Sequence, residues 1–348
     1  HLCDFYHYTH DVVASGSDMR RVLHIGPCET PGGMAKVMNI LAEHPPEGWK
    51  ADLLSTHKNG NPIIKYLAYR KAMKSFKKML ASKDTSIDLV HVHTAADWSW
   101  RRKKRFIIMA RKHSVSCLIH LHSGKFESWM KSPNSVRAKK IRTLINNTDS
   151  QVVVLSDEWK KRLQPYIGFT HVIHNPVDPH VFHDKKIKRE ENRILLLGRN
   201  DAVKGHQFAI KLGEKLVNSI PNLKITMTGI KENLHPWVEA KGWVSEQEKL
   251  DLLQKSSLLI APSEYEGQPL AILEALTCGL PCLASDKIIG LPEIVEFAEL
   301  GNILDWSNKV KNMLNRHIIA EDLISASEPY KINNIVNLWK RIYDNIFD

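Results

Sequence analysis

Short apolar runs alternate with longer amphipathic stretches along most of the chain. In the first half we predict six strands: Val22–Ile25, Asp52–Leu54, Leu89–His93, Cys117–His122, Val152–Leu155 and Val172–His174. The stretches between them have apolar residues at helical spacing and predict four helices: Met34–Ala42, Ile63–Ala81, Arg101–Lys112 and Val136–Ile145. This alternation indicates βαβ units, and therefore a parallel sheet with helices on both faces.

The same alternation begins again in the second half. Its predicted strands are Ile194–Leu197, Lys224–Thr228, Ser257–Ile260 and Cys282–Ala284. Its predicted helices are His206–Asn218, Gln247–Gln254 and Leu270–Leu276. We therefore predict an α/β fold with two Rossmann-like, doubly wound domains in series. Ligands of such sheets bind beyond the carboxyl ends of the strands, so the cleft between the domains is the expected site.

Turn-forming residues mark the boundary between the domains. The segment His174–Pro179 contains two prolines with Asn and Asp, and a polar run follows it. The first domain is then 19–182 and the second 183–330, followed by a C-terminal helix over 331–348 that could pack back on the first domain. Residues 1–18 lack the charged and apolar regions of a signal peptide, so we expect an extension or cloning scar outside the fold.

Composition narrows the class of protein. The 348 residues are 43% hydrophobic and 25% charged, which is typical of a globular protein, and no apolar run approaches the ~20 residues needed to span a bilayer. The net charge of +11 suggests an acidic partner: phosphate, nucleic acid or anionic lipid. The five cysteines contain no Cys-x-x-Cys, which argues against a disulfide scaffold or a cysteine zinc site and favours a reducing cytosol.

Two segments combine glycines with predicted helix starts. After the strand ending at Ile260, a helix is expected to start near Pro269, and the free N–H groups of Gly267, Gln268 and the first turn would form an anion site. Gly32 and Gly33 follow the first strand and would let the backbone approach a phosphate or a sugar, although a glycine pair is equally compatible with a tight turn. The dinucleotide pattern Gly-x-Gly-x-x-Gly is missing there, which counts against NAD binding.

A longer pattern resembles a known enzyme family. Glu266-x7-Glu274, followed by Cys-Gly-Leu-Pro and by Gly-Leu-Pro-Glu-Ile-Val from Gly290, resembles the signature of family 4 retaining glycosyltransferases of GT-B fold, glycosyl transferases group 1. The turn Gly198-Arg-x4-Lys-Gly205 matches the same family. The resemblance implies that Arg199 and Lys204 hold the diphosphate of a nucleotide-sugar donor.

The resemblance also implies an activity. It is the transfer of a sugar from a nucleoside-diphosphate sugar, UDP-sugar being favoured, to a hydroxyl of a saccharide or lipid-linked saccharide in cell-surface polysaccharide biosynthesis. No metal and no other cofactor is expected, and the chain has no Asp-x-Asp. By the same resemblance Glu274 would hold ribose hydroxyls and Glu266 would act at the sugar. The first-turn residues Gln268, Pro269 and Leu270 would contact the donor, and Trp243 would stack on its base, unless it is a core tryptophan.

Pairs of histidines occur on two predicted strands. His91-Val-His93 and His120-Leu-His122 each place two imidazoles on one strand face, a spacing that could suit a metal. The interpretation we favour is that they are strand-end residues facing the cleft. The family resemblance implies that His122 lies close to the transferred sugar and is a catalytic residue.

Basic residues are concentrated in the first half. The run Trp98–Arg105 joins two tryptophans to five successive cations, and Ile64–Leu80 carries six more. Such patterns bind anionic lipid surfaces, so peripheral attachment to the inner face of the cytoplasmic membrane is one interpretation and a solvated basic face is the other. No nucleic-acid motif accompanies the charge. The alternatives to the transferase are a sugar-nucleotide epimerase of the same architecture and a basic nucleic-acid-binding protein with a degenerate enzyme fold.

Overall fold

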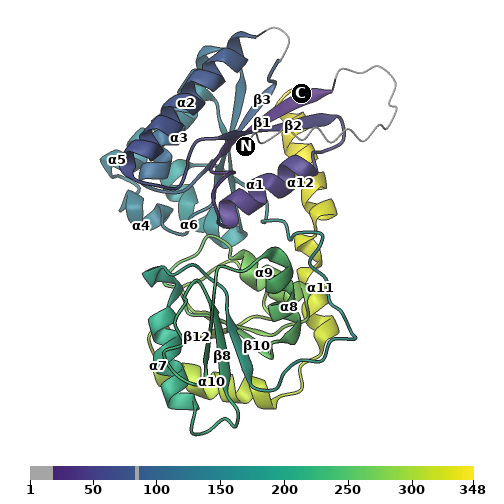
Figure 1. The fold of residues 1–348 in the computed structure, drawn as a ribbon. Coiled ribbons are helices and arrows are strands. Elements are labelled where there is room, and N and C mark those ends of the chain that lie inside the picture. The colour runs from purple at the N-terminus through teal and green to yellow at the C-terminus, as the bar shows by residue number, and fades with distance from the viewer. Residues whose placement is uncertain (1–18, 83–85) are drawn as a thin grey trace.

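The computed structural model describes residues 19–82 and 86–348 and has two α/β domains, one above the other in Figure 1. The segment 1–18, expected to be an extension, lies outside the described residues. Each domain has a six-stranded sheet in which the described strands pair in parallel. The predicted fold class, two doubly wound parallel sheets, is confirmed.

The first sheet has the strand order β2-β1-β3-β4-β5-β6. Its strands are β1 (Arg20–Gly26), β2 (Trp49–Ser55), β3 (Leu89–Thr94), β4 (Ser116–Leu121), β5 (Gln151–Val154) and β6 (His171–Val172). Strands β3 and β4 are buried along nearly their whole length. Both faces of these central strands are buried, as is usual for parallel sheets covered by helices on both sides, so even their histidines are enclosed.

Helices cover both faces of this sheet. They are α1 (Gly33–Glu43), α2 (Pro62–Ala81), α3 (Trp98–Lys112), α4 (Phe126–Met130), α5 (Val136–Thr148) and α6 (Asp157–Ile167). Residues of α2 through α6 share one core cluster with the strands, whereas α1 packs into the cluster on the opposite face. Side-chain caps begin several of these helices: Asn61 accepts from the Ile64 N–H, Ser135 from Ala138 and Ser156 from Trp159.

The second sheet has the order β12-β11-β10-β7-β8-β9. Its strands are β7 (Arg193–Leu196), β8 (Lys224–Thr228), β9 (Val238–Gly242), β10 (Leu258–Ala261), β11 (Cys282–Ser285) and β12 (Glu296–Ala298). Helices α7 (His206–Leu216) and α10 (Ile303–Asn315) cover one face, and α8 (Glu246–Lys255), α9 (Leu270–Thr277) and α11 (Ala320–Ser327) cover the other. The sequence pattern did not separate β9 and β12 from loops because both are short and half-buried edge strands.

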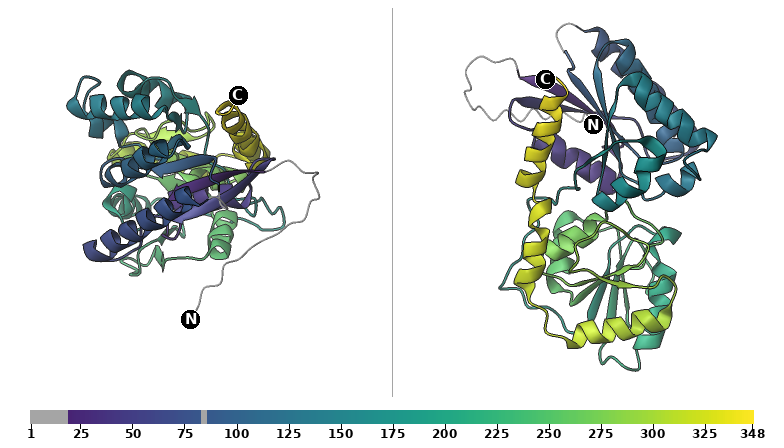
Figure 2. Two further views of the ribbon diagram at one scale, coloured as in Figure 1. Left: turned by 90° about the horizontal axis from the view of Figure 1, so that it is seen from above. Right: turned by 180° about the vertical axis from the view of Figure 1, so that it is seen from behind.

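The last helix, α12 (Ile332–Asn345), runs along the side of the molecule and lies against the first domain (Figure 2). Its buried residues Ile335, Trp339 and Tyr343 pack with Val22 and Leu89 of the first sheet. With α1, this helix covers the face of the sheet that α2 through α6 leave open. The chain therefore crosses between the domains twice.

No helix in the described part of the chain is long and apolar enough to cross a membrane.

Candidate active site

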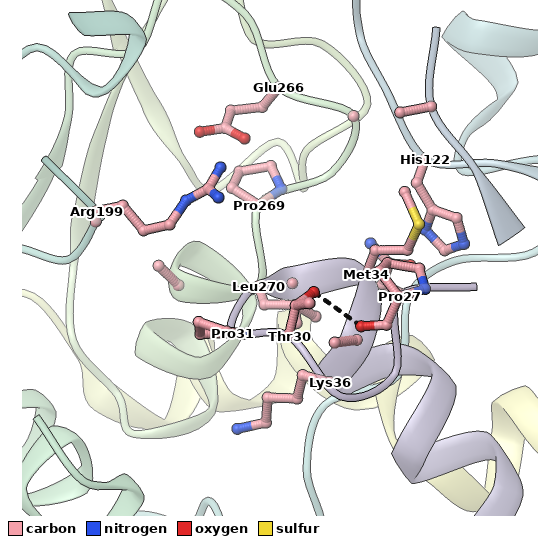
Figure 3. A pocket seen from close by; sticks show the side chains of 18 of the residues that line it. Pro27, Thr30, Pro31, Met34, Lys36, His122, Arg199, Glu266, Pro269 and Leu270 are labelled. Carbon is pink, nitrogen blue, oxygen red and sulfur yellow. Dashed lines mark hydrogen bonds between the residues drawn. The ribbon is translucent and has the colours of Figure 1, made fainter. Parts of the chain in front are cut away.

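A cavity of about 860 Å³ opens between the domains, at the carboxyl ends of both sheets. The first domain contributes the Pro27–Met34 loop, the start of α1 and His122, and the second contributes Arg199, Lys204 and the 265–271 segment. Figure 3 shows Arg199 and Glu266 extending into the same space, opposite the Pro27–Pro31 loop. All the site residues predicted from the sequence line this cavity: Gly32, Gly33, His122, Arg199, Lys204, Trp243, Glu266, Gly267, Gln268, Pro269, Leu270 and Glu274.

The second-domain wall carries two cations on one turn. Arg199 follows β7, and Lys204 ends a short 3-10 turn, Ala202–Lys204, in which the Val203 N–H donates to the Asp201 carboxylate. Gly205 ends the turn with φ +76°, a conformation that side chains rarely adopt. The Lys204 ammonium forms an ion pair with Glu266, whereas the Arg199 side chain is mostly exposed to the cavity. A cation and a carboxylate are thus held in contact where phosphate is expected.

In the loop before α9, the backbone at Gly267 lies very close to the backbone at His122, which follows β4. A Cβ atom on Gly267 would lie 2.1 Å from the carbonyl oxygen of His122, so only glycine fits at this position. The Gly267 carbonyl in turn accepts a hydrogen bond from the Trp159 indole at 2.7 Å. Close approach is therefore the structural reason for the glycine in the predicted motif.

The Gln268 side chain joins the two domains, whereas the prediction from the sequence concerned the backbone N–H of this residue. It is buried, its Oε1 accepts from the Asn175 N–H at 2.7 Å, and its Nε2 donates to the Leu155 carbonyl at 3.2 Å. These hydrogen bonds join the two domains, so the side chain is not available to a ligand.

Two helix N-termini face the cavity. Helix α9 starts at Leu270, with Pro269 as N-cap and no side-chain cap. Helix α1 also starts without a side-chain cap: it begins at Gly33, and its N-cap is Gly32 with φ +146°. Both N-termini therefore present amides at the cavity.

Glu274 is the most buried carboxylate of the site, with its side chain 3% exposed. Its Oε1 accepts from Lys36 of α1 at 2.8 Å and from Lys249 of α8 at 2.9 Å. Lys36 also contacts Glu246 and Asp178. Burial alone would lower the pKa of Lys36, but Glu274 and Glu246 outweigh it and raise this pKa. Sequence reasoning missed Lys36 and Lys249, because a lysine near the start of an amphipathic helix has no distinguishing pattern.

The histidines form a buried network on three adjacent strands. His91, His93 and His120 are fully buried, so the prediction that they face the cleft is wrong for these three. His24 of β1, which the sequence analysis did not single out, joins them. Only His122 reaches the cavity, and its Nε2 lies 2.9 Å from Nδ1 of His93, whose Nε2 lies 2.9 Å from Nδ1 of His24.

This network keeps its imidazoles neutral and orients one of them. Burial lowers the pKa of His122 to about 3 and that of His24 to about 3. Because His93 contacts both rings, the tautomer of His24 and His93 fixes the tautomer of His122. Nitrogens of His24, His91 and His93 lie within 4.8 Å of one another, as do those of His93, His120 and His122. A metal held there would replace the ring-to-ring hydrogen bonds.

Two other predictions concern exposure. Trp243 is 66% exposed and lines the cavity, so the alternative of a core tryptophan is wrong.

The Trp98–Arg105 run is not one surface: Trp98, Arg101, Lys104 and Arg105 are exposed, but Trp100 and Lys103 are buried. The interpretation of two tryptophans and five cations on one face is wrong, because helical periodicity turns Trp100 and Lys103 toward the sheet.

Comparisons with known proteins agree on one family. The model described as glycosyl transferases group 1 matches residues 179–320, and the glycosyltransferase family 4 model matches residues 40–181. An Escherichia coli UDP-Gal:alpha-D-GlcNAc-diphosphoundecaprenol alpha-1,3-galactosyltransferase is 27% identical, over 80% of this chain and 78% of its own. An uncharacterized glycosyltransferase of Haemophilus influenzae is also 27% identical, over 46% of this chain and 51% of its own, so the match spans about half of that relative.

Solved structures share the fold. The sucrose-phosphate synthase of Thermosynechococcus elongatus superposes with a TM-score of 0.75 at 17% identity, over 94% of this chain and 99% of its own. A lipopolysaccharide outer core galactosyltransferase superposes with a TM-score of 0.59 at 16% identity, over 93% and 99% of the two chains. At these identities the likeness concerns the fold alone, which is the two-domain GT-B architecture.

We expect acid to destabilise the protein through the histidine network. In the folded chain His24 has its pKa lowered to about 3, whereas in the unfolded chain it takes up a proton near pH 6.5. Between these values the unfolded state binds more protons, so the free energy of unfolding falls as the pH decreases from 6.5 toward 3, by roughly 2 kcal/mol per such histidine at pH 5. Thermal unfolding followed by circular dichroism at pH 7 and pH 5 measures the effect.

The matched controls are two single substitutions. His24→Gln should reduce the difference in Tm between pH 7 and pH 5, whereas His113→Gln, at an exposed position, should leave it unchanged. Equal pH dependence in all three proteins would contradict this account of the network.

Proposed function

Because this chain belongs to the group 1 glycosyltransferases of GT-B fold, we propose that it transfers a sugar from a nucleoside-diphosphate sugar to an acceptor hydroxyl, with retention of the anomeric configuration. UDP-sugar is the favoured donor, and the acceptor is a saccharide or lipid-linked saccharide. The observation that carries the proposal is that a single cavity gathers Arg199, Lys204 and Glu266 with two helix N-termini that lack side-chain caps, one from each domain.

The departing diphosphate is the charge that this wall would stabilise. Arg199 would bind it as a two-pronged donor and Lys204 as a point charge, with amides of the α9 N-terminus as further donors. Such electrostatic stabilisation is commonly the largest contribution to catalysis. Lys204 already has an anionic partner in Glu266, and phosphate oxygens would take that partner's place. The cations then perform the charge neutralisation, and the proposal requires no metal.

Glu266 and His122 would act at the sugar. Once the diphosphate binds Lys204, the Glu266 carboxylate can orient the sugar or stabilise positive charge at its anomeric carbon. The neutral imidazole of His122 would hydrogen-bond a sugar hydroxyl through its second nitrogen, since Nε2 is occupied by His93. The acceptor hydroxyl would lose its proton to an oxygen of the departing diphosphate.

Glu274 would hold the hydroxyls of the donor ribose. Its hydrogen bonds with Lys36 and Lys249 hold the carboxylate in place, so its remaining oxygen can accept hydrogen bonds at little cost in reorganisation. Trp243, exposed at the same cavity, would stack on the base.

The acceptor side would lie at a membrane surface. Helix α2 begins three residues after Asn59, which lines the cavity. Its first turns expose the apolar side chains of Ile63, Ile64, Tyr66 and Leu67. Trp98 is exposed on the neighbouring α3, with Arg101 stacked 4.7 Å from its ring. Exposed apolar side chains beside cations are typical of interfacial binding. Together with the lipid-linked substrate in the name of the E. coli relative, they support peripheral attachment at the inner face of the cytoplasmic membrane.

Donor profiling tests the proposed activity. Calorimetry with UDP, GDP and their sugars should find one nucleotide bound strongly, and radiolabelled donor should then transfer sugar to saccharide or lipid-linked acceptors. Release of an epimerised sugar without transfer would indicate an epimerase instead. Salt-dependent RNA or DNA binding without nucleotide binding would indicate a nucleic-acid-binding protein.

Arg199→Ala should weaken binding of the nucleoside diphosphate by roughly 1.5–3 kcal/mol, the range for charge-assisted hydrogen bonds. The Tm should change little because this side chain is mostly exposed. Lys211→Ala, an exposed cation on α7, is the control and should bind as the wild type. If the Arg199 variant binds the nucleoside diphosphate with unchanged calorimetric affinity, the diphosphate does not bind at this wall.

Substitution of the two glutamates should change different steady-state parameters. Glu266→Gln should lower kcat strongly with a small change in donor affinity, because its proposed role is at the reacting sugar. Glu274→Gln should mainly raise the donor KM, since its proposed partner is the ribose. A Glu266→Gln enzyme with wild-type kcat would contradict the assignment.

Membrane attachment should depend on the exposed cations of α3. Replacing Arg101, Lys104 and Arg105 with Gln should abolish sedimentation with phosphatidylglycerol vesicles at low salt and leave nucleotide binding intact. The control replaces three exposed lysines of the second domain, Lys186, Lys188 and Lys211. Wild-type protein that sediments equally with phosphatidylcholine vesicles, or with neither, would show a merely solvated face.

A further inference from the structure

Lys103 occupies a core position of α3. The buried residues of this helix are Trp100, Lys103, Phe106, Ile107 and Ala110, the spacing of a single apolar stripe. Four of the five are apolar, and Lys103, which is 1% exposed, stands where packing alone would favour a leucine or methionine. Its side chain nevertheless lines the cavity between the domains.

A buried lysine without a partner is costly. Lysine is almost never fully buried unless it is paired, because its ammonium loses hydration. Among residues 19–82 and 86–348, no carboxylate forms an ion pair with Lys103. Glu43, a carboxylate that lines the cavity in the first domain, is exposed. Burial, and next to it the charge of Arg102, lowers the pKa of Lys103 to about 7.

Two residues near Lys103 each have a buried nitrogen without a hydrogen-bond partner. Nε of Arg102 and Nδ1 of His57 are buried and have no hydrogen-bond partner within the described residues. Both residues line the same cavity as Lys103, and Arg102 and Lys103 both lower the pKa of His57, next to burial. Three nitrogen-bearing side chains from α3 and the β2–α2 loop thus line one wall, and two of them have a buried nitrogen without a hydrogen-bond partner.

The first-domain wall with His57, Arg102 and Lys103 differs from the wall across the cavity that is proposed to bind the donor. Lys204 and Lys36 have carboxylate partners, and both belong to the network around Glu266 and Glu274. Lys103 and Arg102 belong to the first domain and have no such partner among the residues described. In the proposed function the donor diphosphate binds Arg199 and Lys204. The first-domain wall with Lys103 and Arg102 therefore has room for a second anion.

We propose that Lys103, with Arg102 and His57, forms a subsite for a phosphate group carried by the acceptor. The proposal rests on the proposed function and narrows it: the acceptor is a sugar attached to a phosphate or diphosphate, not a neutral saccharide. The phosphate of a bulk lipid headgroup is a poorer fit, because a side chain that is 1% exposed within a cavity does not reach a flat membrane surface. An acceptor that enters the cavity does reach it.

Binding in the presence of saturating UDP tests the subsite apart from the donor wall. A hexose 1-phosphate and the matching methyl hexoside are titrated into the UDP complex by calorimetry, with ionic strength held constant by chloride. We expect the phosphate compound to bind more tightly, and Lys103→Met to weaken it roughly 10- to 100-fold, as expected for a charge-assisted hydrogen bond. The affinity for UDP and for the methyl hexoside should stay unchanged.

The neighbouring exposed lysine provides the matched control. Lys104→Met, on the same helix turn, should bind the hexose 1-phosphate as the wild type does. The Tm of Lys103→Met should equal or exceed that of the wild type, because methionine fits the core stripe without the desolvation cost. A lowered Tm with unchanged phosphate binding would show a packing role and overturn the proposal.

The remaining outcomes separate the sources of failure. If UDP does not bind to the wild type, the proposed function fails. If UDP binds but the two hexose compounds bind equally, the donor site stands and the phosphate subsite is overturned. If Lys103→Met keeps hexose 1-phosphate affinity but loses binding to phosphatidylglycerol vesicles, the ligand is a lipid headgroup and the assignment to the acceptor is overturned.

Discussion

The close approach of two backbones, at Gly267 and His122, is the constraint on which this molecule depends. Each belongs to a segment leaving the carboxyl end of a parallel sheet, and a single added Cβ would put atoms 2.1 Å apart. Around this contact, buried hydrogen bonds of Gln268 with Asn175 and Leu155 join the domains. The cavity lies beside this contact, and both His122 and Gly267 line it.

The charges of the cavity are organised differently on its two walls. On the second-domain side each buried or half-buried carboxylate is held by lysines: Glu266 by Lys204, and Glu274 by Lys36 and Lys249. Lys36 belongs to the first domain, so this ion pair also bridges the domains. Pairing offsets part of the cost of burying these charges, and a ligand's phosphate or hydroxyl could take the place of one partner. The first-domain wall around Lys103 lacks such pairs in the described structure, and its polar groups carry the cost of burial themselves.

The histidine network connects the core of the first sheet to the site. Nδ1 of His91 contacts the Tyr343 hydroxyl of α12 at 2.7 Å, and its Nε2 lies 3.2 Å from Nδ1 of His120. The parallel path from His24 through His93 ends at His122 in the cavity. Neutral imidazoles suit this environment because each ring can donate from one nitrogen and accept at the other, which a buried charge could not do without a counter-ion.

The sequence alone determined the fold class and the second-domain wall, because both depend on local patterns. Alternating strands and helices require a parallel sheet, and Arg199, Lys204, Glu266 and Glu274 lie in short segments whose glycines and helix starts fix them relative to one another. The tertiary structure decided everything that depends on contacts distant in sequence. Lys36 meets Glu274 across 238 residues, and His24 meets His93 across 69. It also decided that Lys103 faces the core and not the surface. Periodicity shows that a helix has two faces, but the side of the sheet on which it packs decides which cation is buried.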